Sequence, residues 1–180
     1  MLQKILSYGT VAGLLVGVPL SVVTISQMGH SSEHNGWVFG YTTMLIALST
    51  VFIAIKRHRD AELGGVIGFW PALGLGLGIS LIAGLFYVLS WEATMAYTHM
   101  DFAGDYARAL IEQQKAKGVS GEALAKFTAD MERFKLQYAN PFYRLPMTFA
   151  EIFPVGVLVS LVSAGLLRNR RFLAARQLPA

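Results

Sequence analysis

The chain has 180 residues, of which 54% are hydrophobic and only 14% are charged, a balance typical of a polytopic membrane protein. It contains no cysteine, which excludes disulfides, zinc–thiolate sites, iron–sulfur clusters and thiol nucleophiles. The net charge of +4 could indicate a nucleic-acid partner, but the bases gather in short segments that flank apolar stretches, so we expect no nucleic acid to bind.

Four long stretches carry almost no charge and are predicted to be transmembrane helices. They cover approximately residues 5–28, 37–55, 68–91 and 146–167. A hydrocarbon core about 30 Å thick requires roughly 20 apolar residues of helix, and helix is required because backbone amides find no water there. The sequence therefore predicts an all-α fold, a four-helix transmembrane bundle that forms a single integral membrane domain over residues 1–180 and contacts the lipid bilayer.

Small residues recur at every fourth position in three of the predicted spans. Such rows let two helix backbones approach closely in lipid. The rows comprise Gly9, Gly13 and Gly17 in the first span, Gly76, Ser80 and Gly84 in the third, and Gly156, Ser160 and Ala164 in the fourth. We expect them to pack the helices of one chain together, and homodimerisation through a spare row is the alternative.

The loop after the first span contains the run His-Ser-Ser-Glu-His, from His30 to His34, which matches an inverted zinc-protease motif on paper. That chemistry requires the motif on a helix with a further carboxylate ligand. Here the run lies in a short hydrophilic loop, and solvated histidines are the favoured interpretation. A metal site formed by His30, His34 and His99 is the weaker hypothesis, and no cofactor is expected.

The segments that flank the spans predict the topology. The N-terminal stub, the loop after the second span and the C-terminal tail hold eight Lys or Arg and two acids, whereas the first loop holds no Lys or Arg. The positive-inside rule therefore places both termini in the cytoplasm. The bases of this cytoplasmic rim include Lys56, Arg57, Arg59, Arg168, Arg170 and Arg171.

The third loop, residues 92–144, is the only sizeable polar part of the chain. It carries seven bases and seven acids, so it can cross to the outer side. Apolar residues recur at helical spacing in two segments: Phe102, Tyr106 and Leu110, then Leu124, Phe127, Met131, Phe134 and Tyr138. We expect an amphipathic helical hairpin over residues 101–139. Its apolar faces are expected to pack on each other or on the membrane surface, and docking a partner protein or covering a ligand site is the alternative.

Glu151 is the main candidate for a functional residue because an acid inside a span is costly. Glu92 closes the third span on the same side, and Tyr87 and Arg144 lie at a similar depth in the sequence. Two carboxylates at one level could bind a cation, a proton or a small polar ligand. The structural alternative has Glu151 hydrogen-bonded to a tyrosine or serine, or paired with Arg144.

Three groups of residues resemble one bacterial membrane family. They are Gly40-Tyr41 with residues 56–60 and Gly64-Gly65, then residues 87–92, then Asn140-Pro141 with residues 148–156. The chain resembles the domain of unknown function numbered 4199, a family of small four-span proteins of the bacterial inner membrane. This resemblance covers nearly the whole chain. It implies an inner-membrane location and hence a periplasmic hairpin, and it implies no activity.

No phosphate loop, serine nucleophile elbow or paired-acid glycosidase pattern occurs in the chain, so an enzymatic role is not favoured. We expect a non-enzymatic scaffold or accessory component that binds another envelope protein or forms a homodimer. The alternative is transport or binding of a cation, a proton or a small polar ligand at Glu92 and Glu151. A membrane enzyme that acts on lipid, or a metal-dependent hydrolase, is a third and weaker hypothesis.

Overall fold

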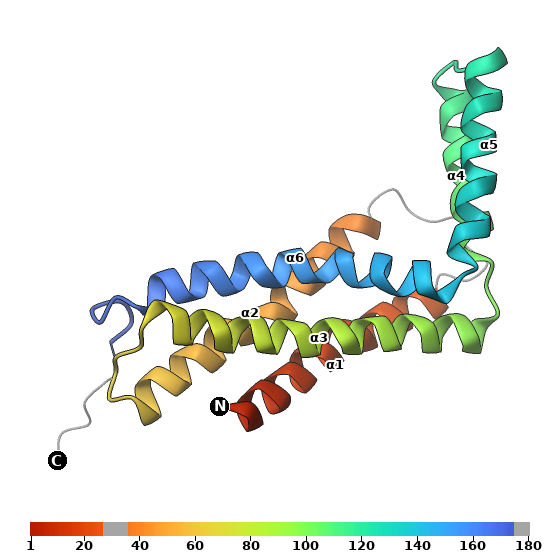
Figure 1. Ribbon diagram of the computed structural model, residues 1–180. Coiled ribbons are helices and arrows are strands. Elements are labelled where there is room, and N and C mark those ends of the chain that lie inside the picture. Colours follow the sequence, from red (N-terminus) through yellow and green to blue (C-terminus); the bar gives the residue numbers. More distant parts are fainter. Residues whose placement is uncertain (27–35, 175–180) are drawn as a thin grey trace.

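The computed structural model describes residues 1–26 and 36–174, and within these ranges it contains helices and no strand. The helices are α1 (Leu2–Ser26), α2 (Gly36–Glu62), α3 (Phe69–Thr98), α4 (Phe102–Ala116), α5 (Gly121–Tyr138) and α6 (Pro141–Leu167). Four long helices run along one bundle, and α4 and α5 form a hairpin at one end of it (Figure 1). The predicted all-α architecture is confirmed.

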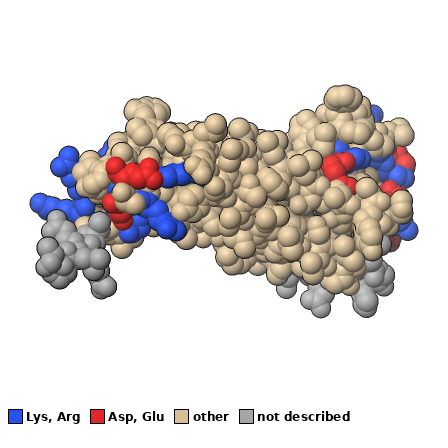
Figure 2. Space-filling model, turned by 90° about the horizontal axis from the view of Figure 1, so that it is seen from below, with Lys and Arg blue, Asp and Glu red and all other residues tan. Residues whose placement is uncertain are grey.

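The four helices of the bundle are α1, α2, α3 and α6, and each is long and apolar enough to cross a membrane. Figure 2 shows a broad band without Lys, Arg, Asp or Glu on the visible face, and charged groups gather at the two ends. Large apolar side chains point outward in this band, including Ile46, Leu89 and Leu158. An apolar exterior between two charged ends suits lipid contact, and the chain is a multi-pass membrane protein.

The glycine row of α1 packs against α3, and the two helices run in the same direction. Every fourth residue of α1 meets every fourth residue of α3, and the pairs are Gly9 with Ile82, Gly13 with Phe86, and Gly17 with Ser90. A methyl group on any of these glycines would overlap its partner side chain. The register continues one turn further, where Thr94 Oγ1 donates a 2.7 Å hydrogen bond to Ser21 Oγ. Small residues thus allow close contact of the two backbones.

Helices α3 and α6 run antiparallel and share a second small-residue contact. Gly76 faces Ser160 and Gly156 faces Ser80, so a serine of each helix packs against a glycine of the other. Each serine also donates to a backbone carbonyl of its own helix, Ser80 to Gly76 at 3.0 Å and Ser160 to Gly156 at 2.7 Å. The hydroxyl protons therefore remain bonded in a region without water.

Helix α2 closes the bundle by packing against α1 and α6. The core of the bundle is formed by apolar side chains that are wholly buried or nearly so, among them Leu48, Val51, Ile55, Leu75, Ile79 and Ile152. The hairpin of α4 and α5 projects sideways from the end of the bundle, across its long axis (Figure 1). Asp101 begins α4 by accepting a 3.0 Å hydrogen bond from the backbone N–H of Gly104, which is an N-cap contact.

Candidate functional site

Arg144 of α6 and Glu92 of α3 form a two-point ion pair at the end of the bundle that carries the hairpin. Arg144 Nε lies 2.6 Å from Glu92 Oε1, and Arg144 Nη2 lies 2.5 Å from Glu92 Oε2. The remaining guanidinium nitrogen, Nη1, donates to the backbone carbonyl of Tyr138 at 3.2 Å. Bidentate pairs of this kind are strong and geometrically specific. The pair therefore links α3, α6 and the end of α5 at one point.

Five aromatic residues, which we call the aromatic brace, join the hairpin to α3. They are Trp91, Phe102, Tyr106, Phe134 and Tyr138, and successive ring centroids lie 4.9 to 5.9 Å apart. Trp91 Nε1 donates a 2.8 Å hydrogen bond to Tyr138 Oη. Burial raises the pKa of the Tyr138 phenol, which stays neutral and accepts this bond. Aromatic contacts and this hydrogen bond fix the hairpin on the bundle.

Glu151 of α6 has a different partner. Tyr87 Oη of α3 donates to Glu151 Oε2 at 3.1 Å, and Tyr87 is buried whereas Glu151 lies on the exposed surface of α6. Glu151 follows Arg144 by about two helical turns, which is on the order of 10 Å along the axis. The structure thus brings the four predicted ligand candidates together as two pairs at two levels, Glu92 with Arg144 and Tyr87 with Glu151.

An apolar groove runs between α3 and α6 near the same end of the bundle. It has a volume of about 530 Å³ and is lined by residues from the 85–89 stretch of α3 and the 142–149 stretch of α6. The lining side chains are aliphatic or aromatic, with Leu89 and Phe142 among them. This surface can contact acyl chains or an apolar helix, and it offers no acid or base to a polar ligand.

The predicted metal candidates are only partly within the described residues. His30 and His34 lie outside the described ranges, while His99 ends α3 in a left-handed conformation with its backbone N–H donating to Met95 O at 3.0 Å. Over residues 1–26 and 36–174, no group of three or more His, Asp or Glu side chains is placed to hold a metal ion.

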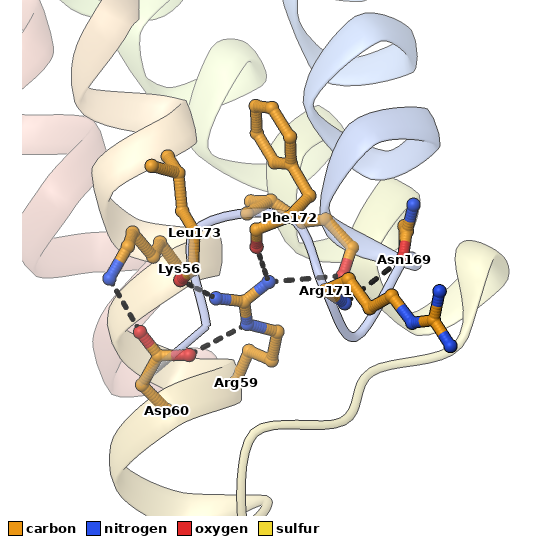
Figure 3. Close-up of polar contacts among 8 residues, drawn as sticks. Lys56, Arg59, Asp60, Asn169, Arg171, Phe172 and Leu173 are labelled. Atoms are coloured by element: carbon orange, nitrogen blue, oxygen red, sulfur yellow. Dashed lines mark hydrogen bonds and ion pairs between the residues drawn. The ribbon is translucent and has the colours of Figure 1, made fainter. Parts of the chain in front are cut away.

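At the opposite end of the bundle, Arg59 is wholly buried. Figure 3 shows its guanidinium between α2 and the turn after α6, where it donates to the backbone carbonyls of Phe172 at 2.9 Å and Leu173 at 2.7 Å. Its Nε donates to Asp60 at 2.7 Å, and Asp60 also accepts from Lys56 at 2.6 Å. This contact ties the C-terminal segment to α2.

Sequence reasoning grouped Arg59 with the basic rim and missed this role. The neighbouring rim residues Arg57, Arg168, Arg170 and Arg171 are exposed. All five arginines lie in short basic runs, and an arginine that points inward has the same local sequence context as one that points outward. The acid next to Arg59 is the one sequence signal that distinguishes it, and Arg57 has no acid beside it.

Comparison with known proteins gives one match. A family model described as "Protein of unknown function (DUF4199)" matches residues 7–169, which is most of the chain and extends from α1 to the turn after α6. Neither the curated proteins nor the solved structures give a match.

Proposed function

The chain belongs to the DUF4199 family, and from this premise we propose that it is a non-enzymatic scaffold or accessory component that binds another envelope protein. In this proposal it lies in the bacterial inner membrane, with both termini in the cytoplasm and the hairpin in the periplasm. The support is the charge distribution, because bases gather at the end of the bundle where Lys4 meets Glu62 and Arg59 binds the C-terminal segment. The positive-inside rule places such an end in the cytoplasm.

The observation that carries the proposal is the rigid attachment of the hairpin. The ion pair of Arg144 with Glu92 and the aromatic brace hold α4 and α5 in one orientation on the bundle. A surface that is already ordered loses little conformational entropy when a partner binds it. The hairpin therefore presents one fixed surface to a partner.

The outward surface of the hairpin has features that suit docking. Its ion pairs, such as Arg108 with Asp105 and Lys115 with Glu112, lie within single helices and are well exposed. Leu136 of α5 is 77% exposed, and its neighbour Lys135 pairs with Glu132 of the same helix. An exposed leucine beside charged residues suits a protein interface, in which apolar contacts are bordered by polar residues.

A photoreactive residue tests this proposal in intact cells. Placed at Leu136, it is expected to form a covalent adduct with a specific envelope protein. The matched control is Leu2, which is also highly exposed but lies at the opposite end of the bundle. Adducts of Leu136 that contain only lipid or a second copy of this chain would contradict the proposal, and so would the same adducts from both positions.

The second candidate function is binding or transport of a cation, a proton or a small polar ligand at Glu92 and Glu151. The observation that favours it is the environment of Glu151, a carboxylate in a span with a hydrogen bond from Tyr87. Glu92 contributes less because Arg144 engages both of its oxygens. Proton or cation flux into proteoliposomes that Glu151→Gln abolishes would support transport, and flux equal to that of empty vesicles would exclude transport.

A further inference from the structure

One face of α6 exposes Glu151 in an otherwise apolar stripe. Its exposed residues follow helical spacing and comprise Met147, Ala150, Glu151, Pro154 and Leu158. Glu151 is the only charged residue between Arg144 and Arg168 of this helix. In a membrane-spanning helix, an outward stripe of this kind faces hydrocarbon unless another helix covers it.

The exposed face of α6 carries two hydrogen-bond acceptors. Glu151 receives a hydrogen bond from Tyr87 on one oxygen, Oε2, within the described part of the chain. Pro154 has no N–H, so the carbonyl of Ala150 lacks the donor that position i+4 of a helix normally supplies. When Glu151 is ionised, its carboxylate and the carbonyl of Ala150 both only accept hydrogen bonds, so the groups missing at this place are donors.

The depth of Glu151 makes this arrangement costly in lipid alone. Trp91 and the Arg144–Glu92 pair mark the polar end of the bundle, and Glu151 lies about two helical turns further in, on the order of 10 Å. Acyl chains donate no hydrogen bonds, and intramembrane acids are found paired with one another or with polar groups of neighbouring helices.

We infer that this stripe of α6 binds a transmembrane helix of another protein, which presents a lysine or arginine side chain to Glu151. A cation neutralises the carboxylate, and its several N–H groups supply the donors that Glu151 and the carbonyl of Ala150 lack. Met147 and Leu158 supply apolar contact on either side. The inference rests on the proposed accessory role and names the chemistry by which the partner is recognised.

A second copy of this chain fits the stripe poorly. A two-fold symmetric dimer through this face would place the same patch of each copy against the other, and would bring two Glu151 carboxylates together. Neither copy would supply a cation there, because Glu151 is the one charged residue between Arg144 and Arg168. The basic side chain that the inference requires therefore comes from a different protein.

Photo-crosslinking from Leu158 tests the inference with the full chain in native membranes. Leu158 lies in the stripe and is 60% exposed, and Leu14 on the lipid-facing side of α1 is the matched control at 50% exposure. We expect Leu158 to form a protein adduct and Leu14 to form none. Mass spectrometry of the Leu158 adduct should identify a transmembrane segment that contains Lys or Arg. Glu151→Gln keeps an acceptor for Tyr87 but removes the charge, and should lower the adduct yield about five- to thirtyfold.

A charge exchange completes the test. Glu151→Lys should abolish the adduct, and replacing the partner's basic residue by Glu should restore it. Adducts from Leu158 that contain only lipid or a second copy of this chain would overturn the inference, as would a yield that Glu151→Gln leaves unchanged.

The photoreactive residue at Leu136 of the hairpin separates this inference from the proposed function. An adduct with an envelope protein from Leu136 but none with a protein from Leu158 leaves the accessory role standing and removes the interface at Glu151. The loss of both protein adducts removes both proposals. The adduct from Leu136 also reports whether the Glu151→Gln chain is folded and inserted.

Discussion

The hydroxyl oxygens of Ser80 and Ser160 lie 3.3 Å apart between α3 and α6. Each serine also occupies the space opposite a glycine of the other helix. This reciprocal contact lies within the apolar spans of the two helices, where close packing of small residues stabilises helix pairs. We therefore expect alanine substitutions at different glycines of α6 to differ strongly in their effect on stability.

Gly156→Ala should destabilise the bundle, because its new Cβ would lie 2.6 Å from Ser80 Cβ and one helix must move. We expect a loss of about 1–3 kcal/mol in the free energy of unfolding, measured by reversible denaturation in mixed micelles. The control is Gly165→Ala in the same helix, where no atom lies within 4 Å of the added methyl group. This control should be neutral or stabilising by up to about 1 kcal/mol. Equal losses for the two variants would contradict the packing.

Glu92 and Arg144 should be coupled energetically. Glu92→Gln or Arg144→Gln is expected to cost about 1–3 kcal/mol, because each leaves a partly buried charge without its partner. The double variant should cost less than the sum of the two single variants. Hydrogen exchange of α5 measures the local effect, since Arg144 also holds the carbonyl of Tyr138. Additive losses in this double-mutant cycle would show that the ion pair does not hold the hairpin.

Attachment of the hairpin should weaken above pH 10. Burial raises the pKa of Tyr138 in the folded protein above its ordinary value of 10.0, so below pH 10 the phenol is neutral in the folded and the unfolded state. As the pH rises beyond that value, the unfolded phenol ionises first and stability falls. Thermal unfolding followed by tryptophan fluorescence measures this loss. Tyr138→Phe should be less stable at neutral pH, since Trp91 Nε1 loses its acceptor, and should lack this part of the alkaline loss.

Arg59 and Arg57 should differ sharply although they are two residues apart. Arg59→Met leaves two backbone carbonyls and Asp60 Oδ1 without their donor, and is expected to cost about 3–5 kcal/mol. Arg57→Met changes an exposed side chain and should alter stability by less than about 0.5 kcal/mol. Proteolysis after residue 168 gives a second readout. Loss of the bond between Arg59 and the carbonyl of Phe172 should expose the C-terminal segment to cleavage in Arg59→Met. Similar behaviour of the two variants would contradict the buried role of Arg59.

The membrane architecture could be predicted because it depends on one-dimensional properties. Four uncharged stretches of sufficient length and the periodic apolar residues of the hairpin are visible in the sequence without any knowledge of contacts. The ends of the helices were harder to predict, since α3 continues to Thr98 and α6 begins at Pro141. A helix does not stop at the limit of the hydrocarbon, because capping and packing outside the membrane decide where it ends.

The pairing of side chains depends on three-dimensional register and could not be predicted. The sequence indicated that Gly9, Gly13 and Gly17 pack closely, but not that they meet Ile82, Phe86 and Ser90 rather than another row of small residues. It also left open whether Glu151 bonds a tyrosine or pairs with Arg144. In the structure Tyr87 bonds Glu151 and Arg144 pairs with Glu92. The partners of Glu151 and Glu92 are set by the antiparallel register of α3 and α6. No local sequence pattern predicts that register.

The parallel contact of α1 with α3 has a consequence for biogenesis. Synthesis reaches α1 before α3, so we expect the glycine row of α1 to contact lipid until the third helix is inserted. Packing of this pair would then follow insertion. A chain truncated after α2 would insert two helices, yet the first of them would lack the neighbour with which it makes most of its contacts.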